Sequence, residues 1–163
     1  MIQYRDLREA SSEQTTAWLE VLAENLRPSD LDEIAASSDL DPLMSLTASV
    51  AVSDMAWVIL SNDIPVAVFG CAPSGHPNSG QVWMMGTPGM DERRTAISIA
   101  RSTVPYLDRM HALYACLWNY IDARNEKSMN WLRWSGFRLL EAHPAHGREG
   151  RLFFTFARYA PRV

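Results

Sequence analysis

Hydrophobic and polar positions follow two different periods in the first part of the chain. In the first seven residues, Ile2 and Tyr4 alternate with polar neighbours, which predicts a short strand. Residues 11–26 instead carry apolar side chains at helical spacing, and Ser11 or Ser12 is a natural N-cap for an amphipathic helix. The inward face of that helix is predicted to consist of Trp18, Leu19, Leu22 and Leu26.

A second helix is predicted immediately after the first, which a proline ends. It covers residues 30–37, and Ser29 or Asp30 is expected to cap it. Leu31 and Ile34 are expected to face inward. The acidic residues in its first turn suit the positive end of the helix dipole.

After a third short helix, predicted over residues 41–52, the middle of the chain changes to strand periodicity. Residues 55–72 hold two apolar runs separated by Ser61–Asp63, and this pattern predicts a hairpin with an Asn/Asp turn. Residues 81–87 then form the third strand of an antiparallel meander.

Helical spacing returns over residues 91–112, where Pro105 is expected to kink the helix or to end its first half. Residues 113–121 are apolar at both odd and even positions, which is typical of a strand in the centre of a sheet. The inward stripe of the predicted helix consists of Ile97, Ala100, Val104 and Leu107.

One more helix and two strands complete the pattern. The helix covers residues 125–137, faces inward with Met129, Trp131 and Leu132, and ends at Gly136. Two strands follow, over residues 138–144 and 150–159, joined by a segment rich in turn-forming residues.

This order of elements predicts an α+β fold: one mixed central β-sheet of about six to seven strands, flanked by helices. The helix between the meander and the central strand implies a parallel crossover connection. The length of 163 residues indicates a single domain, residues 1–163, with one sizeable core.

Composition excludes several classes of function. The formal net charge of −4 provides no basic field, so no nucleic-acid partner is expected. No run approaches the roughly 18 apolar residues of a membrane span. Cys71 and Cys116 lie in apolar runs, which favours buried thiols and synthesis in a reducing cytosol. His143 and His146 have no third ligand nearby in sequence, so no metal site is expected.

The segment from Asn125 through Ser128 to Gly136 and Phe137 resembles the region after the fifth strand of GNAT-fold acetyltransferases. The predicted element order is also similar to theirs over nearly the whole chain. This resemblance implies an acetyl-CoA cofactor whose pantetheine arm contacts the asparagine or the backbone near it. In that family a tyrosine seven residues after the asparagine often protonates the departing thiolate, whereas this chain has Leu132 there.

The phosphate-binding segment of that family also matches only in part. The resemblance implies a glycine-rich loop at residues 91–96, where backbone N–H groups hold the CoA pyrophosphate. Here Asp91 replaces an amide or cationic side chain and Arg94 replaces the first glycine, while Ala96 fits. The guanidinium groups of Arg93 and Arg94 are candidates to offset this by pairing with phosphates.

The resemblance therefore defines a candidate CoA cleft. Its implied cofactor-binding residues are Met85, Thr87, Arg93, Arg94, Asn125 and Ser128. Tyr120, at the end of the central strand, is the weak candidate for the catalytic proton donor, and the alternative is a strand aromatic that only packs. The meander strands offer no Glu or His as a general base.

Several segments together are also similar to a GNAT-like family of bacteriophage proteins that includes an internal virion (core) protein of short-tailed phages. They are ENLRPSDLDEI, PVAVFG, WMMGT, LWNYI and WLRWSGF. This resemblance implies a protein made in the host bacterial cytoplasm and packaged in the virion or needed for its assembly. Its implied partners are phage structural proteins or host proteins.

Two functions follow from these resemblances. The first is a virion-associated or assembly protein that keeps the GNAT scaffold with degenerate catalytic motifs. The alternative is an active phage N-acetyltransferase that uses acetyl-CoA to modify an amine on a host protein or small molecule. Fold alone does not decide between them.

Overall fold

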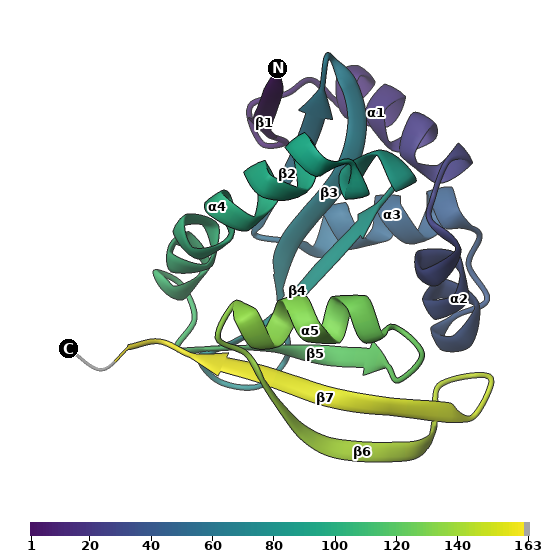
Figure 1. The fold of residues 1–163 in the computed structure, drawn as a ribbon, viewed down its shortest axis with the longest axis vertical. Helices are drawn as coiled ribbons and strands as arrows, with labels where there is room; N and C mark the ends of the chain where they lie inside the picture. Colours follow the sequence, from purple (N-terminus) through teal and green to yellow (C-terminus); the bar gives the residue numbers. More distant parts are fainter. Residues whose placement is uncertain (162–163) are drawn as a thin grey trace.

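The computed structural model describes residues 1–161 as one seven-stranded mixed sheet with helices on its faces (Figure 1). Neighbouring strands follow the order β1-β2-β3-β4-β5-β7-β6. The strands are β1 Ile2–Asp6, β2 Met55–Ser61, β3 Ile64–Pro73, β4 Ser79–Gly86, β5 Cys116–Asp122, β6 Arg138–His146 and β7 Arg151–Tyr159. The helices are α1 Ser12–Glu24, α2 Pro28–Ser37, α3 Pro42–Val52, α4 Arg93–His111 and α5 Glu126–Trp134, with a short 3-10 turn, η1, over Pro88–Asp91. The predicted α+β class is confirmed.

Strands β4 and β5 are parallel neighbours joined through α4, as the crossover rule predicts. Their pairing is short. Ser79, Gly80 and Gln81 pair with the first residues of β5, Cys116 to Trp118, and the two strands then diverge (Figure 1). All other neighbouring strands pair antiparallel. The sheet therefore has an opening in its middle, at the carboxyl ends of its parallel pair.

The two faces of the sheet are covered by different helices. In Figure 1, α4 and α5 lie in front of the sheet, while α1 and α3 lie behind it. On the front, Val82 of β4 and Leu117 of β5 belong to one core cluster with Leu132 of α5. On the back, Trp83 and Met85 pack with residues of α1 and α3. Alternate residues of β4 thus serve opposite faces of the sheet, and residues of both faces line the opening between β4 and β5.

Helix α2 begins two residues earlier than the sequence pattern predicts. Pro28 occupies its first position, where a fixed φ and a missing N–H cost nothing. Neither Ser29 nor Asp30 is the N-cap, which is Arg27. Leu31 is 40% exposed and does not face inward, whereas Ile34 is buried as predicted. The side chain that replaces Leu31 on the buried face is Asp30, at 4% exposure.

Helix α4 buries a different face from the one predicted. Ile97 and Val104 are 42% and 43% exposed, although Leu107 is buried as expected. Threonines occupy part of the buried stripe. A buried threonine hydroxyl can donate a hydrogen bond to a backbone carbonyl one turn earlier, as Thr103 does to the carbonyl of Ile99. The buried stripe consists of Thr95, Ile99, Thr103, Leu107 and Met110. The helix also continues through Pro105 rather than ending there, and it bends towards its C-terminal end in Figure 1.

Local turn chemistry is as the sequence predicts. Asn62 and Asp63 both have positive φ, at 50° and 66°, which is the conformation of a tight hairpin turn between β2 and β3. Gly136 has φ of 93° just after α5, where a left-handed residue ends the helix. In residues 1–161, no helix has both the length and the apolar character needed to cross a membrane.

Candidate functional site

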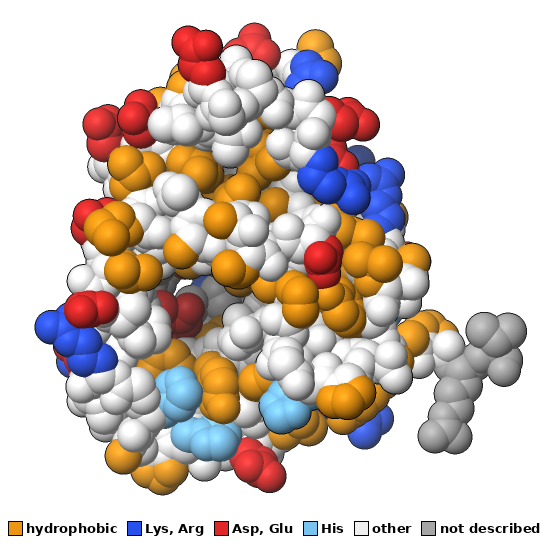
Figure 2. Space-filling model, turned by 180° about the vertical axis from the view of Figure 1, so that it is seen from behind, with side chains coloured by type: hydrophobic (Ala, Val, Ile, Leu, Met, Phe, Trp, Pro, Cys, Tyr) orange, Lys and Arg blue, Asp and Glu red, His pale blue; other side chains and the backbone are white. Residues whose placement is uncertain are grey.

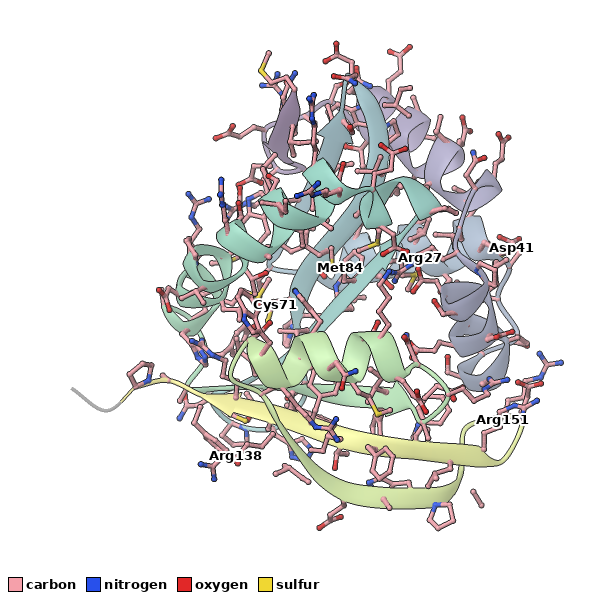
Figure 3. The ribbon with its side chains drawn as sticks, in the orientation of Figure 1. Arg27, Asp41, Cys71, Met84, Arg138 and Arg151 are labelled. Carbon is pink, nitrogen blue, oxygen red and sulfur yellow. The ribbon has the colours of Figure 1, made fainter. Side chains whose placement is uncertain are left out.

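A cavity of about 430 Å³ occupies the opening between β4 and β5. Its walls are the diverging strand segments, one face of α2 and the inner face of α5. In Figure 3, Arg27 and Met84 lie beside the end of β4, above α5. Figure 2 shows the opposite face, which is hollowed, with an acidic side chain visible inside and histidines below. A site with access from both faces of a sheet suits the transfer of a group between two ligands.

The structure brings four of the predicted site residues to this cavity. Met85 lines it from β4, Tyr120 from β5, and Asn125 and Ser128 from the start of α5. Asn125 is also the N-cap of α5, because its side-chain oxygen accepts a hydrogen bond from the N–H of Ser128 at 3.2 Å. The role of these four residues stays a prediction, but all four line the same cavity.

The other three predicted residues lie elsewhere. Thr87 is buried, and its hydroxyl accepts a hydrogen bond from the N–H of Gly89 at 3.2 Å, which holds the turn after β4. Arg93 and Arg94 are exposed in the first turn of α4. They do not line the cavity, so they can contact only a part of a ligand that extends out of it.

Tyr120 is part of an aromatic cluster on the back of the sheet. Its ring stacks on His146 at a centroid distance of 4.1 Å and meets the edge of His143 at 5.3 Å. Trp118 contacts the same ring at 5.5 Å. The cluster fixes the orientation of the phenol beside the cavity. Among residues 1–161, no group of three or more His, Cys, Asp or Glu side chains is arranged to hold a metal.

The structure adds Glu33, which the sequence patterns do not single out. It lines the cavity from α2. Its Oε1 accepts hydrogen bonds from the backbone N–H of Asp122 at 3.1 Å and from the side-chain amide of Asn125 at 3.5 Å. Burial raises the pKa of Glu33 to about 7, with a smaller contribution from the Asp30 carboxylate, although both hydrogen bonds oppose the shift. A carboxyl with this pKa accepts and releases protons near neutral pH.

The sequence contains only an indirect signal for Glu33. Ile34 was expected to face inward, and on a helix the positions three and four residues away share its face. Asp30 and Ser37 are those positions, and Glu33 directly precedes Ile34. Asp30, Glu33, Ile34 and Ser37 all line the cavity. The pattern alone suggests acids on an exposed face, because a buried carboxylate is rare unless the fold supplies a partner.

Buried charge fixes α2 to the end of β4. Asp30 Oδ2 accepts hydrogen bonds from Arg27 Nε at 2.9 Å and from the backbone N–H of Gly86 at 3.0 Å. The backbone N–H of Arg27 also donates to the carbonyl of Gly86. The Arg27 and Asp30 side chains are only 12% and 4% exposed. Glu33, one turn further along α2, is therefore placed relative to β4 by a buried ion pair.

The loop between β4 and α4 uses most of its own N–H groups. Gly86 donates to Asp30, Thr87 to the carbonyl of Val66, and Glu92 to the carbonyl of Gly89. The first N–H groups of α4 have no intrahelical acceptor, and within the described residues Glu92 makes no side-chain cap bond to them. The N-terminus of α4 thus remains able to bind an anion, whereas the loop before it does not.

Asp91 occupies the mouth of the cavity between two cations. Its Oδ1 lies 2.8 Å from Lys127 Nζ on α5 and 3.6 Å from Arg27 Nη1. Lys127 is 72% exposed, so this bridge between η1 and α5 is weak and easily exchanged. An anionic ligand at this mouth would compete with Asp91 for the same two cations.

Solved structures match this fold over nearly its whole length. The ribosomal-protein-S18-alanine N-acetyltransferase from Escherichia coli has a TM-score of 0.67 and 10% identity, covering 100% of this chain and 96% of that one. An acetyltransferase from Bacillus subtilis in complex with CoA has a TM-score of 0.65 and 8% identity, covering 99% and 100%. A GCN5-related N-acetyltransferase from Kribbella flavida has a TM-score of 0.64 and 15% identity, covering 98% of each.

These matches confirm that the chain has the GNAT fold, and at such low identities they show the fold alone. No protein-family model matches the sequence. No curated protein matches it either. Nothing in the comparisons supports the resemblance to phage proteins, which stays a prediction.

Proposed function

We propose that the chain is an N-acyltransferase that uses acyl-CoA to acylate an amine. The observation that carries this proposal is Glu33, a carboxyl with a pKa of about 7 on the wall of a cavity that opens between parallel strands. The fold is that of acetyltransferases, one of which holds CoA. Perturbed carboxyls in cavities are typical of catalytic sites.

The residues of the cavity fit two parts of CoA. The apolar segment Val82–Met85 and the inner face of α5 suit the pantetheine arm. The N-terminus of α4, with Arg27 and Lys127 nearby, suits the pyrophosphate. The carboxylate of Asp91 is the group that opposes binding, because it pairs with Lys127 and also lies close to Arg27. When bound, acyl-CoA would supply the acyl group as a thioester.

Glu33 is proposed as the general base. In its ionised form it takes the proton that the amine nitrogen loses as it forms a bond to the acyl carbon and the carbon–sulfur bond breaks. The hydrogen bonds from Asp122 and Asn125 hold its Oε1, so the carboxyl keeps one orientation. Tyr120 is the residue proposed to protonate the departing sulfur, since Leu132 carries no proton to give.

The pH dependence of the rate is the first prediction. The base must be ionised, so kcat/KM is expected to rise with pH through about 7 and to level off above it, following the pKa of Glu33. The measurement is the rate of thiol release from acetyl-CoA across pH 5.5–9 with the best acceptor from a panel of primary amines. A rate that stays constant between pH 5.5 and 8 would remove Glu33 from the reaction.

Removing the charge of Asp91 is expected to tighten CoA binding. In Asp91→Asn, Lys127 loses its carboxylate partner and Arg27 keeps only Asp30, so more of their positive charge is available to the pyrophosphate. A gain of about fivefold in affinity corresponds to roughly 1 kcal/mol, the size of an exposed charge interaction. Calorimetry with CoA measures the change in affinity. The control is Asp108→Asn, which removes an exposed carboxylate of α4 that does not line the cavity or its mouth. Unchanged or weaker binding by Asp91→Asn contradicts this account of the mouth.

A second candidate function is a scaffold without catalysis, such as the phage virion or assembly protein that the sequence resemblance implies. The observation that favours it is Leu132, buried at 7% exposure where acetyltransferases of this fold often have a tyrosine. Its partners would be phage structural or host proteins, in the host cytoplasm or the particle. Absence of CoA binding, together with copies of this chain in purified particles by mass spectrometry, would favour this function over the enzyme.

A further inference from the structure

We infer that Asn119 and Gln81 close the narrow end of the cavity and limit the acyl group to a short chain. This inference rests on the proposed function, because it specifies which acyl-CoA the cavity accepts. It concerns the point where β4 and β5 separate.

Asn119 replaces the backbone pairing that is lost at this point. The last pair of the parallel ladder is Gln81 with Trp118, so Val82 and Asn119 would come next. Instead, the side-chain amide of Asn119 donates a hydrogen bond to the carbonyl of Val82 at 2.7 Å. Its Oδ1 accepts from the backbone N–H of Tyr120 at 2.8 Å. Two backbone groups that the divergence leaves without a ladder partner are thus satisfied by one side chain.

Gln81 completes the closure. Its Nε2 donates to Oδ1 of Asn119 at 3.1 Å, and both side chains line the cavity. The two amides therefore cross from one strand to the other through fixed hydrogen bonds. A side chain held by three hydrogen bonds resists displacement more than an apolar side chain that only fills space.

The place of this closure in the cavity determines which part of a bound ligand it limits. The mouth, with Arg27, Lys127 and the N-terminus of α4, lies at the wide end of the opening, beside the carboxyl end of β4. A ligand with its phosphates there extends its thioester towards the narrow end, where the amides of Gln81 and Asn119 lie. The acyl group therefore stops at these amides. An acetyl or propionyl group is short enough, whereas a longer chain must displace them.

Calorimetric titration of the full chain with acetyl-CoA, propionyl-CoA and hexanoyl-CoA tests the limit. The wild type is expected to bind the first two with similar affinity and hexanoyl-CoA about tenfold or more weakly. Asn119→Ala vacates space on the order of two methylene groups, which is part of the extra length of a hexanoyl chain, so its affinity for hexanoyl-CoA is expected to rise several-fold towards its affinity for acetyl-CoA. Asn119→Leu has a side chain of similar size without the hydrogen bonds, so it should weaken the preference for short chains less than Asn119→Ala does.

A second variant and a second measurement guard against a folding defect. Gln81→Ala opens the same space while leaving the bonds of Asn119 to the backbone, and it is expected to relax the chain-length limit in the same direction. Asn119→Ala leaves two backbone groups unpaired, and its unfolding midpoint should fall by about 4 °C without ligand.

The outcomes separate this inference from the proposed function. Equal affinity of the wild type for all three acyl-CoA species overturns the inference and leaves the proposed function intact. Wild-type selectivity that persists in both Gln81→Ala and Asn119→Ala also overturns it, because the limit then lies elsewhere. Absence of binding by every acyl-CoA overturns the inference and the proposed function together.

Discussion

Replacing Glu33 by glutamine is expected to lower kcat/KM by about 10²–10³-fold at pH 8, the usual loss when a general base is removed. Glutamine keeps the size of the side chain, and its carbonyl oxygen can still accept the hydrogen bonds from Asp122 and Asn125. The lost property is the ability to accept a proton. The measurement is thiol release from acetyl-CoA with a saturating amine, in the variant and the wild type.

Two controls make the result specific. Asp32→Asn removes an exposed carboxylate from the adjacent position of α2 and should leave the rate unchanged. Glu33→Gln should be no less stable than the wild type at pH 8. Because the folded-state pKa of Glu33 is raised, the stability linked to its protonated form is lost as the pH rises through about 7. A rate for Glu33→Gln within twofold of the wild type would exclude Glu33 as the base.

Replacing Asp30 by alanine is expected to lower the free energy of unfolding by about 3–5 kcal/mol, the cost of leaving one partner of a buried ion pair alone. Asp30 is 4% exposed and holds both Arg27 and the N–H of Gly86. Urea denaturation of the variant and the wild type measures the change.

Two further variants separate the effect of the Asp30 charge from the effect of its buried position. Asp32→Ala, on the exposed face of the same helix, should change the free energy of unfolding by less than about 0.5 kcal/mol. The double variant Arg27→Met with Asp30→Leu removes both charges and should recover much of the loss, because no unpaired charge remains. A loss below about 1 kcal/mol for Asp30→Ala would show that the pair does not anchor α2.

The elements that could be predicted from the sequence are those whose signals are local. Asn62 and Asp63 define the hairpin by their tolerance of positive φ, and Gly136 ends α5 for the same reason. Alternation of apolar residues shows where strands begin, and the helix between β4 and β5 requires a parallel pair. These local rules were sufficient for the correct order of elements and the correct class of fold.

The errors arise where tertiary contacts override local preference. Helix α4 buries Thr95 and Thr103 rather than Ile97 and Val104, and the hydroxyl of Thr103 finds an acceptor within the helix. Helix α2 buries Asp30 because Arg27 and Gly86 supply its partners. No periodicity of apolar residues contains this information, since it does not show which buried polar groups find hydrogen-bond partners.

The candidate site was predictable only in part, for the same reason. Asn125 and Ser128 are identified by their motif, and they do lie at the cavity. Glu33 becomes a candidate only when α2 is placed beside the end of β5, where the N–H of Asp122 contacts it. The closure by Asn119 depends on the divergence of two strands, which a sequence pattern does not show.

Calorimetric titration with acetyl-CoA tests the central claim, that the opening between β4 and β5 binds this cofactor. The wild type is expected to bind with a sub-millimolar Kd. Ser128→Phe, which places a large side chain in the cavity, should abolish binding. Asn130→Phe, with the same substitution on the exposed face of α5, should not affect it. Absence of heat in the wild type, or equal binding by both variants, would contradict the claim.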